Sequence, residues 1–158
     1  MVARKKPEPL ELKFTRTDVV KSRKKLVYAT ATVDDIEVEH VLEFLTADER
    51  IGFVNELHRV LKPGGKARIV TPYWASNIAY SDLAFQWPPI AEGWYFHLNA
   101  DWRKVNNPLE KRYRCNFSCT WGYSLHQLIA SRNMEYQQHA VSFWKEAAQV
   151  LAATLVKE

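Results

Sequence analysis

His40 is the residue that is best suited by type and position to move a proton. Residues 36–41 alternate apolar and polar side chains, which predicts a strand that ends beside this histidine. An unperturbed imidazole titrates near neutral pH, so His40 can act as a general base or orient a substrate. The alternative is a structural histidine whose ring is hydrogen-bonded to the backbone at the end of the strand.

Further candidates follow the apolar segment 67–71. Tyr73 and Asp82 are candidate catalytic groups, and Trp74 and Trp87 are candidate substrate-binding groups. Exposed aromatic rings can enclose an amine or stack on a base, and an aspartate can bind a cation. The alternatives are a small aromatic core under a long loop and, for Asp82, an acid on the surface of a helix.

The remaining histidines and the cysteines predict neither a metal site nor thiol chemistry. His97, His126 and His139 are too far apart in the sequence to suggest a ligand set, and we expect no metal. Cys115 and Cys119 are too widely spaced for a C-x-x-C pair. Two thiols and no recognisable signal peptide favour a reducing cytoplasm.

The length of 158 residues and the 47% hydrophobic content predict one globular domain over residues 10–158, after a flexible basic lead-in over residues 1–9. No apolar run is long enough to cross a bilayer. The net charge of +4 conceals a strongly basic first 25 residues. This segment is either a solvated terminus or a surface for nucleic acid.

A helix and two strands must position His40 and Tyr73. Thr46 and Glu49 form a capping-box pattern, and an apolar helical face follows it up to Lys62. Pro63 and the glycine pair after it end the helix, and residues 67–71 read as a buried strand. A strand, a helix and a strand with short connections predict two parallel neighbours joined by a crossover.

The other elements are predicted from shorter patterns. We expect strands over residues 10–14, 25–33, 117–121 and 150–156, with Asp34 and Asp35 separating the strand at 25–33 from the one that begins at Ile36. A short helix is expected near residues 76–84, followed by a long structured loop up to residue 109. A second short helix or an irregular segment is expected over residues 124–130.

The order of these segments resembles a known enzyme family. D-D-I-E-V-E-H-V-L-E-F-L (34–45), followed by a capped helix and L-K-P-G-G-K-A-R-I-V-T-P (61–72), resembles the second half of class I S-adenosylmethionine-dependent methyltransferases. P-Y-W-A-S (72–76) and Q-W-P-P (86–89) resemble a subgroup of viral and environmental sequences. The resemblance implies an α/β, Rossmann-like, doubly wound, mostly parallel sheet that is truncated in its N-terminal half, with its ligand at the carboxyl ends of the strands.

The resemblance also implies a cofactor, S-adenosylmethionine, and residues that contact it. Asp18 takes the place of the family's ribose-binding acid, and Glu39, His40 and Val41 end the strand beside the cofactor. The chain departs from the family at the first strand, because a glycine-rich loop is missing there and the first glycine is Gly52. We therefore expect a short form without the first motif.

Two more departures concern histidines of the subgroup. Its H-x-x-E-H pattern reads here as H-V-L-E-F, ending at Phe44, and its D-P-T-H pattern reads as D-L-A-F, ending at Phe85. Each change removes a possible base and adds apolar bulk. Two functions follow: methyl transfer to an unidentified acceptor, or a catalytically inactive binding or scaffold protein. In either case residues 10–14, a second copy or a partner chain must cover the open sheet.

Overall fold

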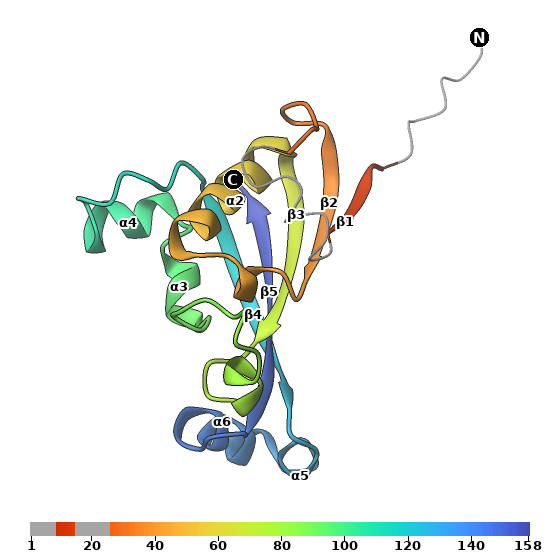
Figure 1. Ribbon diagram of the computed structural model, residues 1–158, viewed down its shortest axis with the longest axis vertical. Helices are drawn as coiled ribbons and strands as arrows, with labels where there is room; N and C mark the ends of the chain where they lie inside the picture. The colour runs from red at the N-terminus through yellow and green to blue at the C-terminus, as the bar shows by residue number, and fades with distance from the viewer. Residues whose placement is uncertain (1–8, 15–25) are drawn as a thin grey trace.

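A five-stranded sheet forms the centre of the computed structural model, which describes residues 9–14 and 26–158 (Figure 1). The first three strands are mutually parallel, and β5 runs antiparallel to both of its neighbours. The expected α/β, Rossmann-like fold is confirmed, with a mixed sheet. The strands in spatial order are β1 (Glu11–Phe14), β2 (Val33–Glu39), β3 (Leu61–Pro72), β5 (Ala148–Lys157) and β4 (Phe117–Leu125).

The predicted strand–helix–strand crossover is present. Helix α2 (Ala47–Val60) begins with the expected capping box, in which the Thr46 hydroxyl accepts from the backbone of Glu49 and the Glu49 carboxylate accepts from the backbone of Thr46. Leu57 on the buried face of α2 belongs to the same hydrophobic core as Ile36 of β2. The crossover therefore places the ends of β2 and β3 side by side, and the register pairs Ile36 with Ala67.

Strand β1 fills the sheet position that the sequence left open. It pairs in parallel with β2, so that Leu12 lies opposite Ile36 and Phe14 lies opposite Val38. The Phe14 ring packs edge-on against Phe53 of α2, with 6.0 Å between the ring centroids. Of the three ways to cover the sheet, the one that uses residues 10–14 of the chain itself is confirmed.

The strand expected over residues 25–33 is wrong, because residues 26–32 form a turn against the end of α2. The Arg59 guanidinium donates to the carbonyls of Leu26 and Tyr28, and the Glu56 carboxylate accepts from the amide of Leu26. Partners from a helix thus satisfy backbone groups that a sheet would otherwise have satisfied. The two aspartates that were expected to end this strand lie inside β2.

The double glycine lies where the register between β2 and β3 shifts. Val33 pairs with Leu61 but Asp35 pairs with Lys66, so extra residues of β3 loop out between these pairs. Gly64 has a φ of 74°, and a Cβ on it would meet nothing within 4 Å. A Cβ on Gly65 would lie 2.8 Å from the Asp34 carbonyl oxygen. The two glycines are therefore needed for different reasons, one for its dihedral angle and one for space.

Substituting asparagine at each glycine separates these reasons. Asparagine tolerates the left-handed region, so Gly64→Asn should lower the free energy of unfolding by less than about 1 kcal/mol. Gly65→Asn forces the backbone of β2 away and should cost about 1–3 kcal/mol. Urea denaturation of both variants measures the difference, and equal losses would contradict this assignment.

The segment between β3 and β4 is more helical than expected. The helix predicted near residues 76–84 is a short 3-10 helix, η2 (Asn77–Tyr80). The predicted long loop is wrong in part, since it contains α3 (Glu92–Phe96) and α4 (Ala100–Asn106). The remaining helices, α5 (Gln127–Ala130) and α6 (Met134–Phe143), lie near the end of the sheet where β3 terminates (Figure 1). Within residues 9–14 and 26–158, no helix is both long and apolar enough to cross a membrane.

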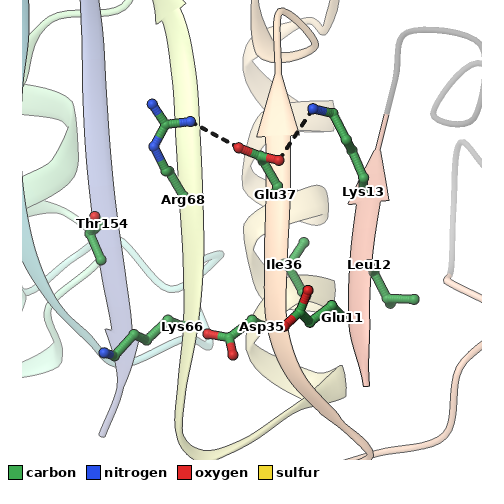
Figure 2. Close-up of a pocket in the computed structure, with 9 residues that line it drawn as sticks. All are labelled: Glu11, Leu12, Lys13, Asp35, Ile36, Glu37, Lys66, Arg68 and Thr154. Carbon is green, nitrogen blue, oxygen red and sulfur yellow. Dashed lines mark hydrogen bonds and ion pairs between the residues drawn. The ribbon is translucent and has the colours of Figure 1, made fainter. Parts of the chain in front are cut away.

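One face of the sheet carries a ladder of charges. Lys13 of β1 and Arg68 of β3 both pair with Glu37 of β2, at 3.2 and 3.0 Å, and Lys13 also pairs with Glu39 at 2.9 Å. In Figure 2 the side chains of Lys13, Glu37 and Arg68 lie in front of the strands, and a helix lies behind the strands. The side chains of Lys13, Arg68 and Glu37 line part of a shallow depression of about 530 Å³. This depression extends toward the amino-terminal ends of the parallel strands.

Candidate functional site

The carboxyl end of β2 turns sharply at His40. Its φ of 53° lies in the left-handed region, which is uncommon for a residue with a side chain. The His40 amide donates to the Val70 carbonyl at 3.0 Å, so the turn is anchored to β3. The imidazole side chain is 53% exposed. The strand end therefore presents an accessible ring at a backbone position that is fixed on the neighbouring strand.

The partner of the His40 ring is Glu43. The 3-10 helix η1 (Leu42–Phe44) brings the carboxylate back toward the strand end, where Glu43 Oε1 lies 3.1 Å from His40 Nδ1. Glu43 is only 6% exposed. Burial raises the pKa of its carboxyl, and the nearby His40 opposes this rise by a smaller amount. The ring is thus bound to a buried carboxyl rather than to the backbone.

Arg50 holds the surrounding segments together. Its buried guanidinium donates to three carbonyl oxygens: Leu42 at 2.9 Å, Gln86 at 2.8 Å and Pro88 at 2.5 Å. The Gln86 amide in turn donates to the Glu43 carbonyl at 2.7 Å. Residues 86–88 are therefore fixed against η1. The sequence analysis missed Arg50, although an arginine directly before the apolar face of a helix was a visible signal.

The rings of Phe44 and Phe85 touch each other. The ring centroids lie 5.0 Å apart, and the ring planes meet at 75°. Phe44 follows Glu43 directly, and Phe85 precedes the segment that Arg50 fixes. The two rings therefore form one apolar contact that joins η1 to residues 85–88.

Tyr73 is buried and bound to a carboxylate elsewhere. It is 3% exposed, and its hydroxyl donates to Glu92 Oε1 at 2.7 Å. The hydroxyl of Tyr123 donates to the same oxygen at 2.5 Å. Burial, followed by the Glu92 carboxylate, raises the pKa of Tyr73. In the part of the chain that the structure describes, no hydrogen bond joins Tyr73 to His40.

The other predicted site residues are spread around this edge of the sheet. Asp82 is exposed and accepts from the amide of Ala84 at 2.8 Å, which closes a local turn. Trp87 is 77% exposed on the segment that Arg50 fixes. Trp74 follows β3 and contributes to a groove of about 410 Å³ between residues 74–80 and the end of α6. Trp74 and Trp87 are thus accessible, whereas Asp82 is engaged in its own turn.

The predicted cofactor residues differ in their burial and in their partners. Asp18 lies outside the described residues, as does most of the basic N-terminal segment, residues 1–8 included. Val41 is buried at 1% exposure. Glu39 is paired with Lys13 on the charged face, and this pairing lowers the pKa of its carboxyl. Among the predicted cofactor residues that the structure describes, His40 has the most exposed polar side chain.

The segment after β1 lacks the glycines that the family resemblance leads one to expect. Strand β1 ends at Phe14, whose side chain is buried. The sequence from there to β2 contains no glycine. A close backbone approach to a cofactor is therefore unavailable at Phe14.

Other titratable groups lie away from this edge. The His58 ring packs edge-on against Phe117, and its Nε2 is buried without a partner among the described residues. Burial lowers the pKa of His58. Cys115 and Cys119 are free thiols, and burial raises their pKa values to about 11 and about 12. Both cysteines are therefore protonated and unreactive near neutral pH.

Comparisons with known proteins agree with this architecture. Residues 1–69 match a family model described as a methyltransferase domain. No curated protein matches the chain. Among solved structures, a SAM-dependent methyltransferase from Archaeoglobus fulgidus aligns with a TM-score of 0.58 and 13% identity, over 91% of this chain and 66% of that one.

Two other solved structures align less well. Phosphoethanolamine N-methyltransferase 2 of Haemonchus contortus, in complex with S-adenosyl-L-methionine, has a TM-score of 0.39 and 12% identity, over 82% of this chain and 34% of that one. Geranyl diphosphate C-methyltransferase of Streptomyces coelicolor A3(2) has a TM-score of 0.40 and 12% identity, over 85% of this chain and 49% of that one. The chain thus spans less than two thirds of the length of these structures.

The resemblance inferred from the segments around His40 and the double glycine is confirmed: the chain has the fold of class I S-adenosylmethionine-dependent methyltransferases, and its first 69 residues match the methyltransferase domain.

Proposed function

We propose that this chain takes part in S-adenosylmethionine-dependent methyl transfer to an acceptor that is bound at the carboxyl ends of β2 and β3. One observation carries the proposal. The parallel crossover ends in an accessible imidazole, His40, whose other ring nitrogen meets a buried carboxyl. In this fold class, ligands bind at the carboxyl ends of the strands, where His40 stands.

We assign a role to each side chain by whether a bound acceptor could reach it. His40 removes the proton of the acceptor, and the exposed Trp87 and Trp74 contact the body of the acceptor. S-adenosylmethionine supplies the methyl group when bound, and Asp18 is the proposed ligand of its ribose. Tyr73 and Asp82 take no part in the reaction, because the Tyr73 hydroxyl is bound to Glu92 and the Asp82 carboxylate closes its own turn.

Calorimetric titration with S-adenosylmethionine and S-adenosylhomocysteine tests the cofactor. We expect both to bind, and Asp18→Ala to weaken binding about tenfold or more, since a hydrogen bond to a charged group contributes about 1.5–3 kcal/mol. Asp101→Ala is the matched control, because Asp101 is an exposed acid paired only with Lys104. Absence of heat at millimolar ligand would refute the proposal.

A binding or scaffold protein without catalysis is the second candidate, and the contact between Phe44 and Phe85 favours it. Both rings occupy positions where the family's subgroup has histidines, and together they form an apolar patch beside His40. The same titration separates the two functions, because a scaffold needs no cofactor.

A further inference from the structure

We propose that Glu43 is a positioning residue that holds the His40 ring in the tautomer with its proton on Nδ1. The lone pair then lies on Nε2, which is the nitrogen available to an acceptor. This inference rests on the proposed function only in giving His40 the role of the base; the tautomer itself is a property of the unliganded chain.

The contact links the position of the ring proton to the charge of Glu43. An ionised carboxylate can only accept hydrogen bonds, so when Glu43 is ionised the Nδ1 of His40, 3.1 Å from Glu43 Oε1, is the donor. No hydrogen bond to His40 Nε2 occurs among the residues that the structure describes. About half of the side chain is exposed, so an acceptor has room to approach the ring. A carboxylate that binds one imidazole nitrogen sets the tautomer and leaves the other nitrogen free.

The backbone that carries both side chains is anchored. Glu43 lies in the middle of η1, its carbonyl accepts from Gln86, and the carbonyl of the preceding Leu42 accepts from Arg50. The left-handed backbone of His40, anchored on Val70, sets the direction of the ring. Both partners of the hydrogen bond are therefore held by groups outside the pair.

Glu43 is attracted to the buried Arg50 guanidinium, but its own burial carries a cost. Its Oε2 is buried and has no hydrogen-bond partner in the described part of the chain. A buried carboxyl with an unsatisfied oxygen destabilises a fold. An apolar side chain of similar size should therefore be tolerated at position 43. Such a side chain cannot form the hydrogen bond to His40 Nδ1.

Nitrogen-15 NMR of the histidine rings tests the proposal, at a pH about two units above the ordinary histidine pKa of about 6.5. In the wild-type chain we expect His40 to show a protonated Nδ1. Glu43→Leu should move the proton largely to Nε2, the form that an unconstrained imidazole prefers. His40→Gln assigns the signals, and the exposed His139 on α6 serves as an internal control that should not change.

A denaturation midpoint for Glu43→Leu at or above that of the wild type is expected and shows that the fold is intact. If that variant does not fold, Glu43→Met replaces it with the same expected result. A wild-type His40 protonated on Nε2, or a spectrum unchanged by either apolar substitution, would overturn the proposal. Neither measurement needs a cofactor, so a chain that shows the tautomer exchange but binds no S-adenosylmethionine refutes the proposed function alone.

Discussion

Arg50→Ala is expected to lower the free energy of unfolding by about 3–5 kcal/mol, because each charged hydrogen bond contributes about 1.5–3 kcal/mol and unpaired buried carbonyls add a further cost. The guanidinium is 3% exposed and serves the carbonyls of Leu42, Gln86 and Pro88. Alanine leaves these oxygens without their donor and opens a cavity under η1. Guanidinium chloride denaturation followed by circular dichroism measures the loss.

Two controls separate the hydrogen bonds from the charge. Arg50→Lys keeps the positive charge but cannot reach three carbonyls, so it should lose most of the same stability. Arg112→Ala removes an exposed arginine that pairs with Asp48 and Glu110, and it should cost less than about 1 kcal/mol. A loss for Arg50→Ala as small as that for Arg112→Ala would show that residues 86–88 are held by other contacts.

Alkaline solution is expected to destabilise the fold steeply, through two buried tyrosines. Burial raises the pKa of both Tyr73 and Tyr95, whereas tyrosines of an unfolded chain titrate near about 10. The stability that these groups contribute is present below that value and is lost as the pH rises above it, because only the unfolded chain releases the protons. Each group lowers the free energy of unfolding by about 1.4 kcal/mol per pH unit. At one pH unit above the tyrosine pKa of the unfolded chain, the two groups together therefore lower it by about 3 kcal/mol.

Tyr95→Phe isolates one of these groups. The Tyr95 hydroxyl is fully buried and has no hydrogen-bond partner in the described ranges, so the variant should be about as stable as the wild type at neutral pH. In alkaline solution it should lose stability less steeply than the wild type. Tyr80→Phe is the matched control, since Tyr80 is 52% exposed and its removal should leave the slope unchanged. Parallel alkaline curves for the wild type and Tyr95→Phe would contradict the assignment.

Short-range signals explain which elements were predicted correctly. The capping box at Thr46 lies within a few residues of the groups that it affects, so α2 and a strand after it could be predicted. The boundary between them was wrong, because α2 ends at Val60 and β3 already begins at Leu61, so that Pro63 and the double glycine lie in the strand. The alternation over residues 36–41 likewise predicts the core face of β2. For the strand at residues 25–33 the same kind of signal failed, because Arg59 and Glu56 supply partners from a distant helix.

The candidate site could be predicted only in part. His40 was singled out from its place at a strand end, but its partner Glu43 was not. The direction of Glu43 depends on η1, and the environment of η1 depends on Arg50 and on residues 86–88 far along the chain. The fate of Tyr73 depends on Glu92, which lies in a helix that the sequence pattern did not predict.

The sequence by itself determined the parallel crossover from β2 through α2 to β3 and the place of His40 at its end, because caps, breakers and periodic patterns act over a few residues. Only the tertiary structure decided that β1 completes the sheet, that Phe44 meets Phe85, and that a buried Glu43 holds the His40 ring. Packing and hydrogen bonds bring together residues that are distant in the sequence. A local sequence pattern does not determine which distant residue contacts a given side chain.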